Sequence, residues 1–330
     1  MPVNRKLRNF INYFLGPIVI LWVGYSTYTH IIRQPNREAA WASIRSSLRG
    51  DGPLLLGATL LLMLVNWGIE SRKWQLLVRQ LEPISFRKAY FSVLTGVSIS
   101  INTPNRIGEY GGRILYLQPE NRLKAISLNM VTSVSQLIVT MVMGILGVCY
   151  LLANLSRGAL DKHGLTPFWL DVLIYGGTAF CALTVVLYFR LSWLVRILEA
   201  IPALRKVKPY IAVLDHYEWP LLASMLLLST IRFVVFVTQY ILVFRLFSVD
   251  VTWWQGFWAV SVLMLILAVI PTITLTEPLI RQGVAITLLG LFNNNSMGVG
   301  FASFVIWIIN LIIPALLGGL LILGIKIIKD

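Results

Sequence analysis

Charged residues are scarce in this sequence. Only 13% of its 330 residues are charged, whereas soluble proteins carry about a quarter. Hydrophobic residues make up 57% of the chain, and the mean hydropathy is +0.76. So little charge leaves too little polar surface to cover a water-soluble globule, which excludes a soluble enzyme and a disordered chain. We therefore expect a polytopic membrane protein.

Cysteine and histidine are also rare. The two cysteines, Cys149 and Cys181, both lie in apolar stretches, which excludes a disulfide-stabilised secreted domain. The three histidines, His30, His163 and His216, are far apart, and neither an HxxxH nor a CxxC spacing occurs. The sequence therefore predicts neither a metal site nor a bound cofactor.

The chain is nevertheless basic, with a formal net charge of +14. The excess Lys and Arg residues lie mostly in loops that flank apolar segments, where they set orientation and attract anionic lipid headgroups. We therefore do not expect nucleic acid as a partner. The distribution of these charges predicts a multi-pass protein of the cell (inner) membrane with both termini in the cytoplasm.

Six segments are apolar enough to cross a membrane, whose hydrocarbon core needs about 20 helical residues. The first is too long for the apolar core of a signal peptide, and no A-x-A-like cleavage site follows it, so we expect a retained helix. The six predicted spans cover residues 11–32, 53–77, 124–153, 168–189, 220–247 and 297–325.

Two further apolar stretches, residues 84–118 and 253–291, are interrupted by Pro, Gly, Thr and charged residues. Broken backbone survives at membrane depth only when it is buried in protein or lines a wet cavity. We therefore predict that each stretch forms a re-entrant helical hairpin. The threonine hydroxyls there either satisfy freed backbone groups or contact a headgroup. The residues expected to shape the hairpins are Pro104, Gly108, Gly112, Pro271, Thr274 and Thr276.

The two hairpins share a pattern of charge. In both, a Pro precedes a Glu by five or six residues and an Arg follows four residues after the Glu, as Glu109–Arg113 and Glu277–Arg281. Each half of the chain, residues 1–155 and 156–330, then holds three spans and one hairpin. An odd number of spans inverts the second half relative to the first. We predict an all-α membrane protein built as an inverted repeat, the alternative being two unrelated Pro-kinked helices.

Charges at membrane depth cost about 2.5–3.5 kcal/mol each on insertion scales, so they indicate function. Arginines outnumber glutamates among them, and the surplus favours an anion, with phosphate the natural partner for planar guanidinium groups. The Glu–Arg pairs have the alternative role of holding the hairpins together. The candidate substrate-binding residues are Arg106, Glu109, Arg113, Arg232, Glu277 and Arg281.

Other polar residues in the spans receive a structural interpretation. Glu70 lies where its span meets the cytoplasm, and we expect it to pair with Lys73 at the membrane interface rather than to contact a ligand. The remaining amide side chains are expected to hold helices together; they are Asn66, Asn129, Gln136, Gln239 and Asn310.

The hairpin sequences resemble a known family. SFRKAYFSVLTG leads into TPNRIGEYGGR, and IPTITLTEPLIRQGVA and WIINLIIPALLGGLL follow later in the chain. Their order and spacing are similar to those of the flippase-like membrane domain of lysylphosphatidylglycerol synthases. Pro104, Gly108 and Glu109 match the first family motif. Pro271, Arg281 and Gly283 fit the second, where Thr276-Glu277 replaces part of a glycine stretch.

The resemblance implies that the chain moves a lipid between leaflets or binds one. We expect a flippase or scramblase for an anionic or aminoacylated phospholipid, or for a polyprenyl-phosphate-linked lipid. No synthase domain follows the similar region, so we expect a stand-alone member without enzymatic activity. No ATP-binding GxxxxGK[ST] motif occurs, so transport would be passive or ion-coupled, with Glu109 and Glu277 as candidate proton carriers.

Two other classes of function stay open at this point. One is a membrane scaffold or lipid-binding accessory protein, which would leave the surplus of buried positive charge unexplained. The other is an intramembrane lipid-phosphate transferase, which would need a cluster such as DxxD or HxxE that the acids do not form. The sequence also leaves open whether the chain forms a homo-oligomer.

Overall fold

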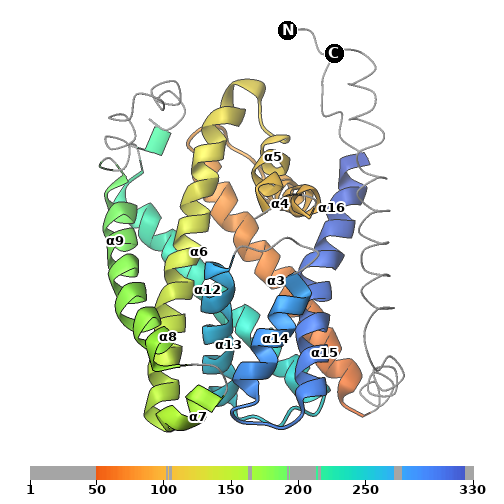
Figure 1. Ribbon diagram of the computed structural model, residues 1–330. Helices are drawn as coiled ribbons and strands as arrows, with labels where there is room; N and C mark the ends of the chain where they lie inside the picture. The colour runs from red at the N-terminus through yellow and green to blue at the C-terminus, as the bar shows by residue number, and fades with distance from the viewer. Residues whose placement is uncertain are drawn as a thin grey trace.

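The computed structural model describes residues 50–323, except for 102, 104, 105, 163–165, 192, 194–212, 215, 216 and 271–276. All regular structure in the described residues is helical (Figure 1). The predicted all-α fold class is thereby confirmed. The predicted span 11–32 and both chain termini lie outside the described residues.

Within the described residues, five helical segments are long and apolar enough to cross a membrane. They correspond closely to the predicted spans 53–77, 124–153, 168–189, 220–247 and 297–325. The first, second and fourth are the single helices α3 (Gly52–Val78), α6 (Pro119–Asn154) and α12 (Trp219–Leu246). The third and fifth each contain one π-helical turn.

The third span joins α8 (Pro167–Asp171), the π-helical turn η2 (Val172–Gly176) and α9 (Gly177–Phe189). The fifth joins α15 (Ser296–Trp307), the π-helical turn η5 (Ile308–Ile312) and α16 (Ile313–Leu323). Such π-helical turns are often found at functional sites. A short helix, α7 (Arg157–Lys162), follows the second span.

The two interrupted stretches each form a pair of shorter helices. Residues 84–118 contain α4 (Phe86–Ser100) and α5 (Gly108–Ile114), and residues 253–291 contain α13 (Trp253–Val269) and α14 (Glu277–Leu289). The α4–α5 pair lies near the upper end of the bundle in Figure 1, and α13 and α14 lie in its lower half.

Local sequence fixes where these helices begin. The Ser85 hydroxyl accepts a 3.2 Å hydrogen bond from the Lys88 N–H and caps α4. Thr252 and Gln255 form a reciprocal capping box at the start of α13. Pro53, Pro119 and Pro220 stand in the first turns of α3, α6 and α12, where a proline costs no helical hydrogen bond.

Two glycines allow the first helix pair to pack closely. A Cβ atom on Gly112 of α5 would lie 2.5 Å from the Gly96 Cα of α4, and a Cβ atom on Gly108 would lie 2.7 Å from the Ile99 carbonyl oxygen. Neither position has room for a side chain. Gly108 and Gly112 therefore allow α5 to pack directly against α4.

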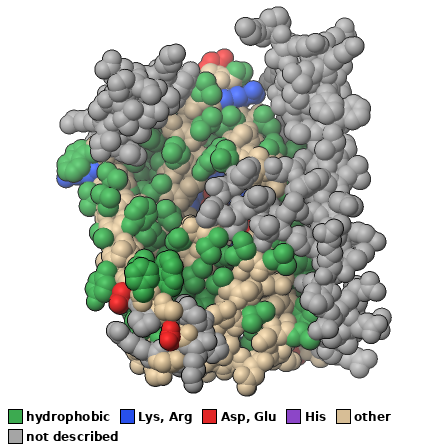
Figure 2. Space-filling model, in the orientation of Figure 1, with side chains coloured by type: hydrophobic (Ala, Val, Ile, Leu, Met, Phe, Trp, Pro, Cys, Tyr) green, Lys and Arg blue, Asp and Glu red, His purple; other side chains and the backbone are tan. Residues whose placement is uncertain are grey.

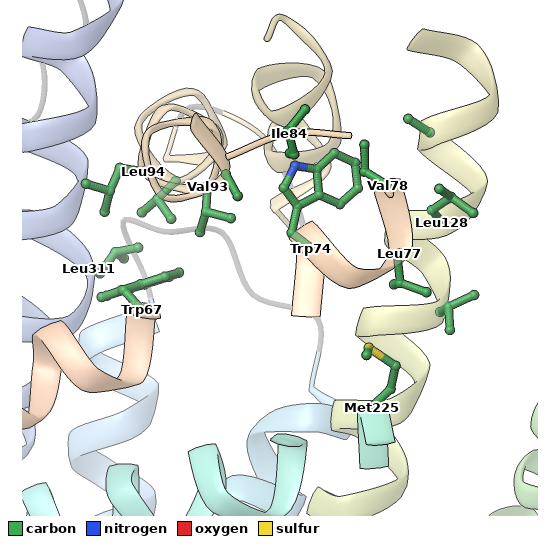
Figure 3. Close-up of a cluster of buried hydrophobic side chains, with 14 of the residues drawn as sticks. Trp67, Trp74, Leu77, Val78, Ile84, Val93, Leu94, Leu128, Met225 and Leu311 are labelled. Carbon is green, nitrogen blue, oxygen red and sulfur yellow. The ribbon is translucent and has the colours of Figure 1, made fainter. Parts of the chain in front are cut away.

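The buried apolar side chains form two large clusters. One surrounds the α4–α5 pair and includes Trp74, Val93 and Leu94 (Figure 3). The other surrounds α13 and α14 and includes Phe257, Leu263 and Leu288. Many other apolar side chains face outward, as the hydrophobic surface in Figure 2 shows. Apolar side chains on the exterior are what a lipid environment favours.

Candidate functional site

A cavity of about 190 Å³ lies between the two apolar clusters. Its wall combines side chains from α3, α6, α12, α13, α14 and α15, together with η5 and the break before α5. A liquid water molecule occupies about 30 Å³, so this space accommodates a group the size of a phosphate. The charged residues in the wall are Arg106, Arg232, Glu277 and Arg281.

The rest of the wall contains both polar and apolar side chains. The polar part comes from the amides Asn66, Gln136 and Asn310 and the hydroxyl of Thr140. The apolar part comes from Trp67, Phe233, Phe236, Met264, Ile306, Trp307 and Leu311. A wall with both characters suits a ligand that has a polar head and an apolar body.

Arg232 of α12 is held from several directions. Its Nε donates a 2.9 Å hydrogen bond to Asn66 of α3, and its NH1 donates a 3.2 Å bond to Gln136 of α6. The same NH1 lies 3.3 Å from a carboxylate oxygen of Glu70, and the guanidinium stacks 5.4 Å from the Trp67 ring centroid. These contacts fix one arginine of the cavity wall.

Arg281 of α14 is buried beside Glu277. Its NH2 donates a 2.6 Å hydrogen bond to the Glu277 carboxylate, and its NH1 donates a 2.9 Å bond to the Tyr240 hydroxyl of α12. The predicted Glu277–Arg281 pair is therefore present. The Nε atom of Arg281 is buried and has no hydrogen-bond partner among the described residues.

Arg106 lies in the break between α4 and α5 and is the most exposed arginine of the wall. Its side chain is 40% exposed, and its NH2 lies 3.7 Å from the Glu277 carboxylate. Its backbone is left-handed, with φ 58°, a conformation that costs a non-glycine residue about 1–3 kcal/mol. Such strain is retained where the surrounding structure imposes it, and it often marks a functional position.

The turn around Arg106 is closed by Thr103. The Arg106 N–H donates a 3.3 Å hydrogen bond to the Thr103 carbonyl, and the Gly108 N–H donates a 2.8 Å bond to the Thr103 hydroxyl. These bonds hold the strained residue so that its side chain reaches Glu277 of α14.

Glu109 and Arg113 belong to a second charged cluster. The two pair as predicted, and Arg113 also donates hydrogen bonds of 2.9 Å to Glu70 and 3.0 Å to Asn129. Glu70 additionally lies 3.3 Å from Lys73. Neither Glu109 nor Arg113 lines the cavity. Of the six candidate residues, the structure thus brings four to the cavity and two to this adjoining cluster.

The expected Glu70–Lys73 pair is present, but it is buried inside the protein. Glu70 does pair with Lys73, but their side chains are only 6% and 0% exposed, and Glu70 also contacts Arg113 and Arg232. Glu70 is therefore a buried centre of charge. The nearby cations Lys73, Arg113 and Arg232 offset the cost of burying its carboxylate.

The two charged groups differ in balance. The second cluster holds two carboxylates, Glu70 and Glu109, against two cations, Lys73 and Arg113. The cavity wall holds three arginines against the single carboxylate of Glu277. Arg232 also pairs with Glu70, so the wall without Arg232 still holds Arg106 and Arg281 against Glu277. This remaining positive charge favours an anionic occupant.

The amide residues mostly connect helices, as expected. Asn66 donates a 3.2 Å hydrogen bond to Asn310 of η5, and Gln239 donates a 3.0 Å bond to the Thr59 carbonyl of α3. Asn66, Gln136 and Asn310 have a second place, because they also line the cavity.

A comparison with known protein families matches residues 13–318 to the lysylphosphatidylglycerol synthase transmembrane region. The match covers most of the chain. The chain belongs to this family. Among curated proteins, no match was found. The match includes both helix pairs and the entire cavity wall of this member of the lysylphosphatidylglycerol synthase transmembrane-region family.

Four residues expected to shape the hairpins in this family member, Pro104, Pro271, Thr274 and Thr276, lie outside the described residues. The partners of the charged groups that were not predicted as site residues include Glu70, Trp67, Lys73 and Tyr240. The charge spacing of Glu70 and Lys73 was a usable signal in the sequence. Nothing in the sequence around Tyr240 distinguishes it from the other aromatic residues of its span.

Proposed function

We propose that this protein moves phosphate-bearing lipids between membrane leaflets as a flippase or scramblase and has no enzymatic activity of its own. The observation that carries the proposal is a cavity among membrane-spanning helices whose wall holds three arginines against one carboxylate. Planar guanidinium groups suit phosphate oxygens, and desolvated charge of one sign is stable only with a partner.

The apolar part of the wall supports a lipid rather than a free ion as the substrate. Phe233, Phe236 and Met264, on α12 and α13, line the cavity and offer a surface for hydrocarbon. Phospholipids and polyprenyl-phosphate-linked lipids share this combination of phosphate and chain, so the proposal includes both.

We infer that the two helix pairs are re-entrant hairpins of an inverted repeat. The helices α4, α5, α13 and α14 have 15, 7, 17 and 13 residues, fewer than the about 20 needed to span a bilayer. In both pairs, the arginine four residues after the glutamate bonds to the span that precedes the pair. Arg113 bonds to Glu70 of α3, and Arg281 bonds to Tyr240 of α12.

The charge distribution supports a cytoplasmic location for the end of the bundle where α3 ends and α6 begins. Arg72, Arg79, Arg87, Arg122 and Lys124 lie at or near the ends of helices there. Positive residues concentrate on the cytoplasmic side of membrane proteins. This orientation accords with cytoplasmic termini in a protein of the cell (inner) membrane.

The experiment compares arginine variants in reconstituted vesicles that contain a headgroup-labelled phosphatidylglycerol. Arg106→Gln and Arg281→Gln should each lower the rate of transbilayer movement about tenfold, because a hydrogen bond to a charged group contributes about 1.5–3 kcal/mol. Arg245→Gln is the matched control, since Arg245 lies on α12 but is exposed near its end. Its rate should stay at the wild-type value.

Circular dichroism and melting curves identify variants that are folded before their rates are compared. Equal, small effects at Arg106, Arg281 and Arg245 would contradict the proposal and favour a scaffold. A loop or interfacial charge contributes only about 1 kcal/mol of nonspecific attraction to anionic lipid, and such attraction does not distinguish the positions.

A further inference from the structure

The contact between Arg106 and Glu277 joins the two helix pairs across the cavity. Arg106 precedes α5, and Glu277 is the first residue of α14. Their 3.7 Å separation is the only ion pair between the two predicted hairpins among the described residues. Both residues line the cavity, so a ligand there meets this pair directly.

Glu277 has two arginine partners, and they are unequal. Arg281 lies 2.6 Å from its carboxylate, four residues along the same helix, with a side chain only 11% exposed. Arg106 lies 3.7 Å away and its side chain is 40% exposed. If Arg106 leaves Glu277 for another anion, the Glu277 carboxylate remains paired with Arg281. The move therefore leaves no buried charge without a partner.

We propose that Glu277 is a resident competitor for the ligand's phosphate. In the empty cavity its carboxylate neutralises Arg106, and an arriving phosphate takes over Arg106 while Glu277 keeps Arg281. This inference rests on the proposed function and describes how that site is regulated. Binding separates the two predicted hairpins at this contact, and the competition keeps the phosphate affinity low enough for release.

The first hairpin lacks a corresponding competitor. Its carboxylate, Glu109, pairs with Arg113, whose other partners Glu70 and Asn129 are also buried. That group contains as many carboxylates as cations and lies outside the cavity wall. Competition is therefore a property of the Arg106–Glu277 contact and not of every Glu–Arg pair in the protein.

The competitor role predicts opposite effects for the two partners of one ion pair. Glu277→Gln removes the competing carboxylate and should tighten phosphate binding about three- to tenfold, the range expected for a partly exposed ion pair in a low-dielectric site. Arg106→Gln removes a phosphate ligand and should weaken binding. If the pair only held the helices together, both changes would weaken binding.

The test measures the dissociation constant of the full chain in a neutral detergent by isothermal titration calorimetry. One arm uses inorganic phosphate and the other uses dioctanoyl phosphatidic acid, which separates a free anion from a lipid headgroup as the source of phosphate. Glu82→Gln is the control, because Glu82 forms a 3.5 Å ion pair with Lys88 away from the cavity. Its affinities should equal those of the wild type.

The competitor role would be overturned if Glu277→Gln bound the phosphate ligand no more tightly than the wild type, in whichever arm the wild type binds. Binding of inorganic phosphate without phosphatidic acid would contradict the proposed lipid substrate, while the sign of the Glu277 effect would still decide the competitor role. Absence of binding in both arms by all variants would overturn both proposals.

A second variant covers the case in which Glu277→Gln does not fold. Glu277→Asp keeps a carboxylate for Arg281 but is shorter by one methylene, which draws it away from the longer Arg106 contact. It should tighten phosphate binding by a smaller factor than Glu277→Gln. Affinity that is unchanged or weaker in Glu277→Asp would likewise overturn the competitor role.

Discussion

Arg113 of α5 donates a 2.9 Å hydrogen bond to Glu70 of α3, and both side chains are almost completely buried. This pair ties the α4–α5 pair to α3, the span that precedes it. In the α13–α14 pair, Arg281 bonds instead to the neutral hydroxyl of Tyr240. Arg106, from the break in the first pair, instead lies 3.7 Å from Glu277 at the cavity, where its positive charge can meet a ligand.

Glu70 should be among the most sensitive positions for stability. Glu70→Gln removes the carboxylate that pairs with Lys73, Arg113 and Arg232, and among the described residues only Arg113 keeps a second one, that of Glu109. Breaking a buried ion pair costs about 3–5 kcal/mol. The free energy of unfolding in detergent should fall by that amount. Glu82→Gln, which removes a carboxylate from a more exposed pair, should cost about 0–1 kcal/mol. Equal losses in the two variants would show that Glu70 does not carry this network.

Glu82, in the loop after α3, gives a pH dependence that can be measured. Partial burial raises the pKa of Glu82. Hydrogen bonds from the Asn121 side chain and the Gln118 N–H, together with the nearby charge of Lys88, lower it by more, so the pKa lies below its ordinary value of 4.5. A carboxyl group with a lowered folded-state pKa stabilises the fold above its unfolded pKa, and this contribution is lost as the pH falls through the folded-state pKa.

Melting temperatures of wild type and Glu82→Gln should therefore differ at neutral pH and converge as the pH falls below about 4. The wild type should be the more stable at neutral pH, by less than about 1 kcal/mol. A difference that stays constant between pH 7 and pH 3 would contradict the role assigned to the carboxylate.

Two adjacent glycines in α5 provide a matched test of packing. A Cβ atom on Gly112 would lie 2.5 Å from Gly96, whereas one on Gly111 would meet nothing within 4 Å. Gly112→Ala should therefore lower the free energy of unfolding by about 1–3 kcal/mol. Gly111→Ala should be neutral or stabilise by up to about 1 kcal/mol through helix propensity. The reverse order would contradict the close packing of α4 and α5.

Accessibility to thiol reagents tests the inverted repeat. Ile107 and Leu279 lie near the breaks of the two helix pairs and are 61% and 58% exposed. Single cysteines at these positions, in a background without Cys149 and Cys181, should react with membrane-impermeant reagents from opposite sides of the membrane. Labelling of both cysteines from the same side under every condition would be incompatible with an inverted arrangement.

The sequence predicts the spans well because apolar length is a direct requirement of the bilayer. For example, the predicted span 220–247 and the observed helix α12 (Trp219–Leu246) differ by one residue at each end. The sequence also predicts the Glu–Arg pairs, because residues four apart on a helix lie on the same face. Both kinds of information are local.

Contacts between distant helices are not local, and there the prediction was incomplete. Glu70 appeared interfacial because it lies near the end of a span, but the tertiary fold brings Arg113 and Arg232 against it. The same cause separated Glu109 and Arg113 from the cavity, although their charge pattern matches that of Glu277 and Arg281. Position along a span does not reveal which neighbouring helix a side chain meets.

The most direct measurement of the proposed function is a cryo-electron microscopy map of the protein in nanodiscs that contain phosphatidylglycerol. The predicted result is headgroup density within hydrogen-bond distance of Arg106, Arg232 and Arg281, with a connected acyl chain along Phe233 and Phe236. In the occupied cavity, Arg106 should have moved from Glu277 to the phosphate. A well-resolved cavity that contains only water, with lipid confined to the outer surface, would contradict a lipid-phosphate site.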